Sequence, residues 1–154
     1  CYLRFAREAS PVFTDPNEPF VIGKAKMLQD GKDATIIGNG SILYEAILAH
    51  ELLKNEGISV RVLNMHTLKP LDEAAVLTAA KETGAIVTFE DAQIIGGLGG
   101  AVAELLVKNK PVPVEMVGIK DQFMECGTME ELSVKYELTA KALVTAVKQV
   151  IARK

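Results

Sequence analysis

Tryptophan is absent from this chain, whose 154 residues include only two cysteines and two histidines. Cys1 and Cys126 are too few and too far apart to frame a disulfide-stapled domain. Together with His50 and His66 they do not give the ligand spacing of a metal site either. The sequence therefore predicts no metal centre, and its sparse cysteines fit the reducing cytoplasm.

Long apolar runs and clusters of one charge are also missing. No stretch approaches the roughly 20 apolar residues that cross a bilayer, and no signal peptide is visible. The 17 Lys and Arg and the 20 Asp and Glu are spread along the chain, for a net charge of −3. Nucleic-acid-binding proteins carry basic patches instead. We therefore expect neither a membrane nor a nucleic-acid partner.

What is present fits a folded domain with linker sequence before it. Hydrophobic residues make up 49% and charged residues 24% of the chain, a composition that supports a buried core. Residues 1–7 form a strand-like run without an initiator Met, which we interpret as the end of a preceding domain. Residues 8–19 contain three prolines and predict an extended linker. Residues 20–154 are then one domain.

Apolar strands alternate with helices through this domain. A strand at 20–28 is followed by Asp30-Gly31, a turn signal that predicts a hairpin with the next strand. Helix caps are expected at Ser41 and Thr139, a capping box at Thr128 and Glu131, and glycine stops at Gly57 and Gly84. The predicted fold is α/β, a three-layer α/β/α sandwich on a five-stranded mixed sheet with one antiparallel edge strand. The other expected strands are 34–37, 58–65, 85–89 and 112–117, and the main helices 41–56, 72–83, 96–109 and 139–151.

Two glycine-rich turns are candidate binding sites. Residues 38–43, Gly-Asn-Gly-Ser-Ile-Leu, resemble the start of a dinucleotide fingerprint, but Leu43 replaces its third glycine. A tight turn before a helix is the favoured reading there. The second turn, residues 96–100, either contacts an anion or packs closely against a strand or a partner subunit. No lysine follows it as in a P-loop, so close packing or an interface is favoured.

Acidic residues precede this second turn at the end of a strand. The carboxyl edge of an open α/β sheet is where ligands bind, and His66 is expected at the same edge. Without a second acid or a histidine nearby in sequence, a polar loop or interface is the favoured interpretation. The candidate interface or anion-contacting turn comprises Glu90, Asp91, Gly96, Gly97 and Gly99, and no residue is assigned a catalytic role.

Three stretches in register resemble the C-terminal domain of the transketolase family: residues 60–72, 86–99 and 127–139. The resemblance extends over nearly all of residues 20–154. Relatives include deoxyxylulose-phosphate synthases and the β subunits of 2-oxoacid dehydrogenases. Many relatives have His where this chain has Ala92, so no role of that His transfers here.

The resemblance implies that the chemistry depends on other domains. In this family an N-terminal domain binds thiamine diphosphate through Mg²⁺, using a Gly-Asp-Gly…Asn motif, and a middle pyrimidine-binding domain supplies the activating glutamate. This chain has neither the Gly-Asp-Gly motif nor that middle domain, so thiamine diphosphate and Mg²⁺ are expected outside it, and the isolated chain is expected to be inactive. The implied partners are the thiamine-binding domains or subunit of the same enzyme, within a homodimeric holoenzyme.

Residues 2–7 resemble the last strand of that pyrimidine-binding domain, where relatives place arginine near the sugar phosphate. Arg4 is the first candidate and Arg7 the second. A guanidinium binds phosphate bidentately and is always charged. A surface salt bridge is the alternative for either residue.

The leading functional hypothesis is two-carbon ketol transfer between sugar phosphates, as in the pentose phosphate pathway, with this domain supporting dimer assembly and stability. One alternative is the C-terminal domain of a deoxyxylulose-phosphate synthase. Others are a stand-alone dinucleotide-binding module that uses residues 38–41, and an anion-binding module that uses residues 96–100.

Overall fold

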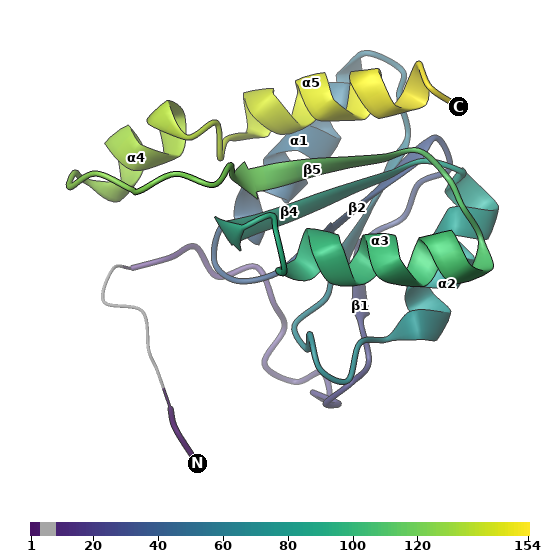
Figure 1. Cartoon of the computed structure of the whole chain (residues 1–154), viewed down its shortest axis with the longest axis horizontal. Coiled ribbons are helices and arrows are strands. Elements are labelled where there is room, and N and C mark those ends of the chain that lie inside the picture. The colour runs from purple at the N-terminus through teal and green to yellow at the C-terminus, as the bar shows by residue number, and fades with distance from the viewer. Residues whose placement is uncertain (4–8) are drawn as a thin grey trace.

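Five strands form one mixed sheet in the order β1-β3-β2-β4-β5 (Figure 1). A computed structural model describes residues 1–3 and 9–154. Strands β2 to β5 are mutually parallel, and β1 pairs antiparallel with β3 at one edge. The predicted five-stranded sheet with an antiparallel edge strand is confirmed. The strands are β1 (Lys26–Gln29), β2 (Ala34–Gly38), β3 (Val60–Asn64), β4 (Ile86–Gln93) and β5 (Val114–Ile119).

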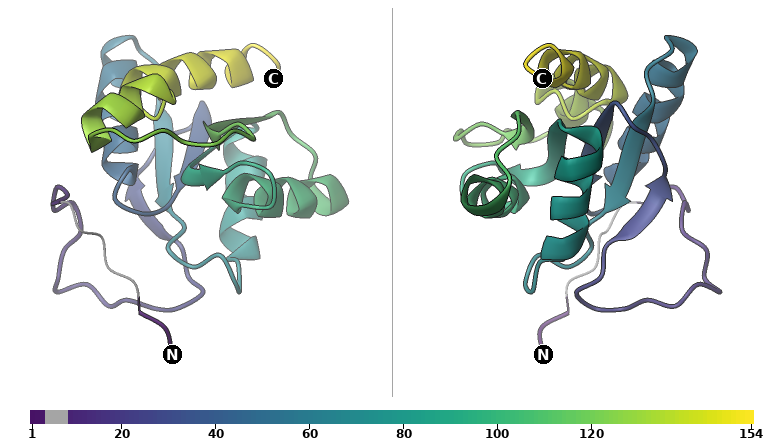
Figure 2. Two further views of the ribbon diagram at one scale, coloured as in Figure 1. Left: turned by 60° about the vertical axis from the view of Figure 1, so that its left-hand side comes forward. Right: turned by 90° about the vertical axis from the view of Figure 1, so that its right-hand side faces the viewer.

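Helices cover both faces of the sheet, which confirms the three-layer sandwich. One face packs on α1 (Leu43–Asn55) and α5 (Ala140–Ile151), and the other on α2 (Glu73–Thr83) and α3 (Leu98–Asn109). Figure 2 shows these two layers on either side of the sheet. The short helix α4 (Met129–Lys135) projects beyond the end of β5 (Figure 1).

The mostly apolar sequence of β2, in which Thr35 is the one polar residue, reflects burial on both faces. All five residues of β2 are buried, and the neighbours Ile36 and Ile37 belong to separate core clusters. Side chains alternate across a strand, so each isoleucine faces a different helical layer. Burying such a side chain contributes about 1.5–3 kcal/mol, which explains why a central strand tolerates no polar alternation.

The predicted hairpin between the first two strands is wrong. β1 pairs with β3, since β2 already has β3 on one side and β4 on the other. After β1 the chain crosses closely over the start of β3. A Cβ on Gly31 would lie 2.3 Å from the carbonyl carbon of Val60, so this crossing requires glycine. The Asp30-Gly31 signal marks this crossing and not a hairpin turn.

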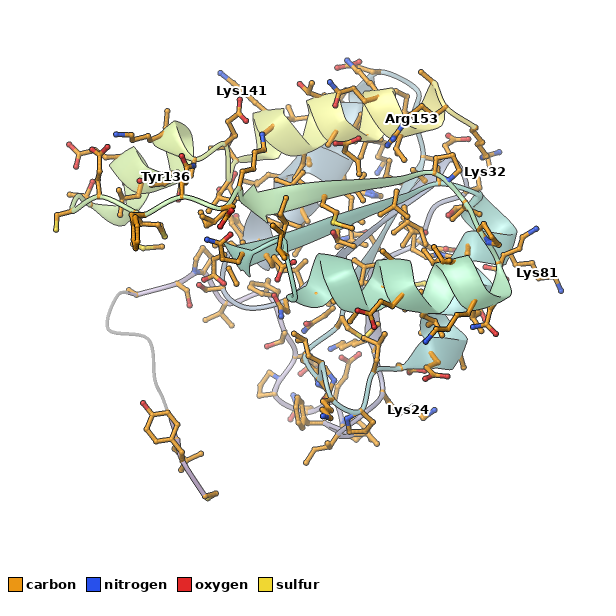
Figure 3. All side chains as sticks on the ribbon, in the orientation of Figure 1. Lys24, Lys32, Lys81, Tyr136, Lys141 and Arg153 are labelled. Carbon is orange, nitrogen blue, oxygen red and sulfur yellow. The ribbon has the colours of Figure 1, made fainter. Side chains whose placement is uncertain are left out.

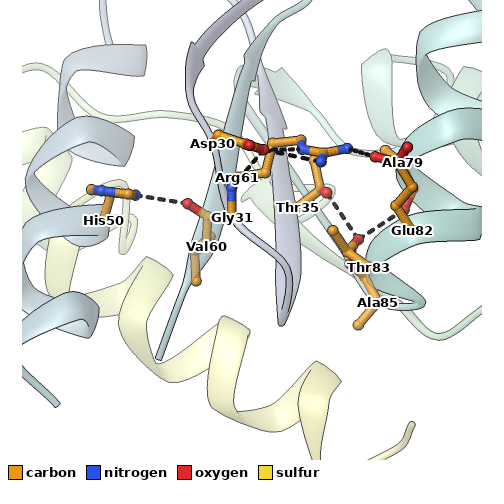
Figure 4. Close-up of polar contacts among 10 residues, drawn as sticks. All are labelled: Asp30, Gly31, Thr35, His50, Val60, Arg61, Ala79, Glu82, Thr83 and Ala85. Carbon is orange, nitrogen blue, oxygen red and sulfur yellow. Dashed lines mark hydrogen bonds and ion pairs between the residues drawn. The ribbon is translucent and has the colours of Figure 1, made fainter. Parts of the chain in front are cut away.

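Arg61 fixes the crossing (Figure 4). Its Nη2 lies 3.0 Å from Oδ1 of Asp30, and its Nη1 lies 2.6 Å from Oε2 of Glu82 in α2. Burial lowers the pKa of the Arg61 guanidinium, but hydrogen bonds to Glu82 and Asp30 outweigh burial and raise it. The pKa of Asp30 lies below 3.8, first because the Gly31 N–H donates to it and then because of Arg61.

Most predicted helix ends are confirmed. The capping box of Thr128 and Glu131 is formed, Thr139 caps α5, and Gly57 and Gly84 have φ of +80° and +66°. The predicted Ser41 cap is wrong. Helix α1 begins after Ile42 without a side-chain cap, because a turn of backbone hydrogen bonds precedes it. Within residues 1–3 and 9–154, no helix is long and apolar enough to cross a membrane.

Candidate functional site

The candidate site lies at the carboxyl edge of the sheet, between β2 and β4. The chain leaves β2 toward β3 on one side and later returns to β4 on the other. Open α/β sheets bind ligands at such a switch point. The first glycine turn approaches the acidic end of β4 here, since a Cβ on Gly40 would lie 3.8 Å from Oδ1 of Asp91. The structure thus brings the first glycine turn to one of the acids that the sequence singled out.

The side chain of Glu90, which belongs to β4, lies at the N-terminus of α3. Its Oε2 accepts the backbone N–H of Leu98 and its Oε1 that of Gly99, both at 2.8 Å, and the residue is 2% exposed. The first N–H groups of a helix have no partner within the helix, and they carry the positive end of its dipole. The Glu90 carboxylate therefore already fills the place where this helix would bind an anion.

Packing against Glu90 and the sheet explains two of the glycines. A Cβ on Gly97 would lie 2.1 Å from Oε2 of Glu90. A Cβ on Gly99 would lie 2.9 Å from both Oγ1 of Thr88 and Sδ of Met116. Gly96 differs, because its φ is +76° and a Cβ there would meet nothing within 4 Å. Gly97 and Gly99 thus allow close packing, whereas Gly96 supplies the turn.

The end of β4 continues past the predicted boundary and contacts the end of β5. The Ile94 N–H donates to the carbonyl of Ile119 at 3.1 Å, and the Asp121 N–H donates to Oε1 of Gln93 at 2.9 Å. Asp91 is exposed beside this irregular stretch. The end of β4 is therefore held against the end of β5 and the loop that follows it, at the carboxyl edge.

His66 lies at the same edge but away from Glu90, on the β3 side. Its ring packs against Phe20 at 4.2 Å between centroids, and its Nδ1 lies 3.0 Å from Oγ1 of Thr67 (the donor depends on the tautomer). The same Thr67 oxygen accepts the N–H of Gly23 at 3.1 Å. These contacts place His66 as an anchor for residues 20–24, beside a hollow of about 700 Å³.

The first glycine turn is a tightly packed turn that uses two of its N–H groups within itself. A Cβ on Gly38 would lie 2.6 Å from Cδ1 of the buried Leu43. The N–H groups of Leu43 and Tyr44 donate to the carbonyls of Gly40 and Ser41. A dinucleotide pyrophosphate needs such N–H groups free, so this geometry favours the tight-turn reading.

The remaining polar residues have structural surroundings. The buried His50 places Nδ1 2.7 Å from the carbonyl of Val60, so this nitrogen carries a proton (Figure 4). Cys126 is exposed and unpaired. Among residues 1–3 and 9–154, no three His, Cys, Asp or Glu side chains are grouped to hold a metal ion. Arg4 and Arg7, the expected phosphate ligands, lie outside the described residues.

The role of Glu90 is the feature that sequence reasoning missed. From the sequence we expected Glu90 and the glycines at one edge of the sheet, and we interpreted the carboxylate as part of a polar loop or interface. The available signal was an acid at a strand end, followed within eight residues by a glycine turn and a helix without a capping side chain. Such a helix start needs an acceptor from elsewhere in the fold.

Comparison with known proteins points to one family. Residues 23–143 match the family described as transketolase, C-terminal domain. The chain is 47% identical to the 6-deoxy-6-sulfo-D-fructose transketolase subunit SqwH of Clostridium sp. (strain MSTE9), covering 99% of this chain and 48% of that protein. It is 42% identical to an apulose-4-phosphate transketolase subunit of Phocaeicola vulgatus, covering 92% of this chain and 46% of that protein.

A solved structure agrees in fold. A chain described as "Split gene transketolase, inactive beta4 tetramer" superposes with a TM-score of 0.93 at 41% identity, covering 96% of this chain and 48% of that chain. The present chain therefore spans about half the length of the transketolase subunits that it matches. From its sequence and its structure together, this chain belongs to the transketolase family, as a transketolase C-terminal domain.

Proposed function

We propose that the chain is the C-terminal domain of a split transketolase subunit, in an enzyme that moves a two-carbon ketol unit between sugar phosphates. The observation that carries this proposal is the identity of 47% and 42% to two transketolase subunits over nearly the whole chain. We place the enzyme in the cytoplasm and in pentose phosphate metabolism. The free thiols of Cys1 and Cys126 support the reducing compartment.

Thiamine diphosphate and Mg²⁺ are proposed to bind outside this chain. A diphosphate needs free N–H donors or a cation with oxygen ligands. At the carboxyl edge the N–H groups of Leu98 and Gly99 already donate to Glu90, and those of Leu43 and Tyr44 donate within their own turn. These residues do not fit the cofactor, so we derive no catalytic step on this chain and expect it to be inactive alone.

The domain's contribution is assembly and stability. We propose that the turn of Glu90, Asp91, Gly96, Gly97 and Gly99 forms part of a subunit interface, with Glu90 shaping it from within. The companion subunit or domains hold the cofactor. The solved relative described as a β4 tetramer supports a further point, namely that this chain also associates with copies of itself, as a homodimer within the holoenzyme.

Arg4 and Arg7 are proposed to bind the sugar phosphate. The support comes from the resemblance of residues 2–7 to the end of a pyrimidine-binding domain and from guanidinium chemistry. Arg4 is proposed as the main ligand.

A deoxyxylulose-phosphate synthase is the second candidate. The chain is 38% identical to the 1-deoxy-D-xylulose-5-phosphate synthase of Syntrophotalea carbinolica, over 87% of this chain and 21% of that protein. The higher identity to transketolase subunits favours ketol transfer.

The test is product analysis with the complete enzyme, made from this subunit and its companion with thiamine diphosphate and Mg²⁺. Transfer from a ketose phosphate to an aldose phosphate supports the proposal. Formation of 1-deoxy-D-xylulose 5-phosphate instead would support the second candidate, a deoxyxylulose-phosphate synthase. Tight NAD binding by this chain alone, measured by calorimetry, would favour a dinucleotide-binding module.

A further inference from the structure

The loop between β5 and α4 is held by hydrogen bonds, although all of its side chains are exposed. We call residues 120–131 the acidic arm. The Asp121 N–H donates to Gln93 at one end, and the Glu125 N–H donates to the hydroxyl of Tyr136 at 2.8 Å in the middle. The capping box of Thr128 closes the other end. Two hydrogen bonds thus hold this exposed loop to residues outside it, and the capping box orders its own end.

The acidic arm carries large apolar side chains into solvent. Phe123 is fully exposed, and Met124 and Met129 are each 49% exposed. Ile95, 71% exposed, follows the stretch of β4 to which the arm is hydrogen-bonded. A solvent-exposed aromatic side chain beside further apolar groups has the character of an interface anchor.

The charge of the arm restricts what can cover it. Residues 120–131 contain one lysine and four acids, a formal charge of −3, equal to that of the whole chain. Two arms placed against each other would bring these like charges together, which costs binding energy. The arm therefore needs an apolar surface that is not acidic.

The chain itself has such a surface at the opposite edge of the sheet. The hollow of about 700 Å³ beside β1 is lined by apolar residues that include Pro16, Pro19, Phe20 and Val21. Its four charged lining residues balance, since Asp15 and Glu18 oppose Lys24 and Lys26, and Lys26 pairs with Glu18. Hollows of ~300–1,000 Å³ are the size that buries small organic groups, and a phenyl ring is well within it. We call this the β1 hollow.

The arm and the β1 hollow lie at the same end of the strands but on opposite flanks. The arm follows the carboxyl end of β5, and the hollow includes Asn64 and His66 at the carboxyl end of β3. Figure 3 shows Tyr136 beside the arm and Lys24 beside the hollow at well separated places on the molecule. Between them lie the turns of Gly40 and Gly96, with the exposed side chains of Asp91 and Ile95 beside them.

We infer that two copies of this chain associate through the carboxyl edges of their sheets, with Phe123 of each copy inserted into the β1 hollow of the other. In a two-fold interface each contact occurs twice: if the arm of one copy contacts the hollow of the other, the arm of the other contacts the hollow of the first. Placement of arm and hollow on opposite flanks satisfies this condition. The inference rests on the self-association given under the proposed function and specifies its surface.

The arrangement is tested by sedimentation velocity on the protein without its companion, using complementary variants. Phe123→Ser removes the anchor, and Val21→Glu places an acid in the hollow, where it faces the acidic arm. Val107→Ser is the matched control, because Val107 is also exposed (73%) but lies in α3, away from both features. None of the three side chains is buried, so thermal unfolding is expected to stay unchanged.

The expected result is a wild-type dimer, with the dissociation constant raised about 10- to 100-fold by Phe123→Ser and by Val21→Glu and unchanged by Val107→Ser. Mixing the two defective variants restores association in part, since the mixed pair keeps one of its two contacts. The inference is overturned if the wild type stays monomeric at about 100 µM, if either variant dimerises normally, or if mixing restores nothing. Because no catalytic activity is measured, failure here leaves the proposed reaction untouched, and the reverse also holds.

Discussion

Glu90 and Gly97 compete for one space at the start of α3. A Cβ on residue 97 would lie 2.1 Å from Oε2 of Glu90, the oxygen that accepts the N–H of Leu98. The glycine therefore makes room for a buried carboxylate that the helix needs. This pairing explains the glycine at position 97 without any bound ligand.

Removing the carboxylate is expected to destabilise the fold. Glu90→Ala leaves the N–H groups of Leu98 and Gly99 without an acceptor, at an expected cost of about 2–4 kcal/mol in the free energy of unfolding. Glu104→Ala, on the exposed face of α3, should change it by less than about 0.5 kcal/mol. Urea unfolding measures both. Equal effects of the two variants would show that Glu90 does not act as the cap.

Adding a methyl group at residue 97 should destabilise through overlap with the Glu90 carboxylate and with the backbone carbonyl oxygen of Gln93. Gly97→Ala is expected to cost about 3 kcal/mol because of the overlap. Gly96→Ala meets no atoms, so it should cost only the roughly 1–2 kcal/mol of a left-handed backbone. In the double variant Glu90→Ala/Gly97→Ala the combined cost should be clearly less than the sum of the two single costs. Strict additivity in a double-mutant cycle would contradict the shared space.

The Arg61 cluster should be visible in the titration of Asp30. The folded pKa of Asp30 lies below its ordinary 3.8. The stabilisation from this carboxylate is therefore present above pH 3.8 and is lost as the pH falls through the folded pKa. Arg61→Gln should raise the pKa of Asp30 in an NMR titration, though not to 3.8, because the Gly31 N–H still donates to it.

Arg153→Gln is the control for this titration. Arg153 pairs with Glu115 and the carbonyl of Val114, not with Asp30. It should leave the Asp30 pKa in place. A normal Asp30 pKa in the wild type, or an equal shift in both variants, would contradict the described cluster.

The proposed phosphate ligands predict a substrate effect in the complete enzyme. Arg4→Ala should raise the KM for a sugar-phosphate substrate about 10- to 100-fold, as expected for the loss of charge-assisted hydrogen bonds. Arg7→Ala should have a smaller effect, and Lys141→Ala on the exposed surface none. Steady-state kinetics with a phosphorylated and an unphosphorylated acceptor separate the cases. An equal KM change for both acceptors would remove the phosphate role.

The layered fold was predictable because it depends on local patterns. Ile36 and Ile37 sit in an apolar run that only a doubly covered strand explains, and Thr128, Thr139 and Gly84 cap their helices by contacts within a few residues. These signals are contained in short stretches of sequence. They need no knowledge of how distant segments pack.

What the sequence did not predict depends on distant segments. β1 cannot pair with β2, because β3 and β4 already occupy the two sides of β2, and it pairs with β3 instead. The role of Glu90 depends on the glycine turn, which places the start of α3 against the Glu90 side chain. The role of His66 depends on its contact with Phe20, which lies far earlier in the chain. Each of these contacts follows from the assembled sheet and not from local propensity.

The most direct test of the central claim is a titration of this subunit into its companion, supplied with thiamine diphosphate and Mg²⁺. The rate of ketol transfer from a ketose phosphate is followed as the subunit is added. The account predicts negligible transfer with either component alone and a rate that rises and saturates as the complex forms. Full transfer by the companion alone, or no transfer at any ratio although the two proteins bind, would contradict it.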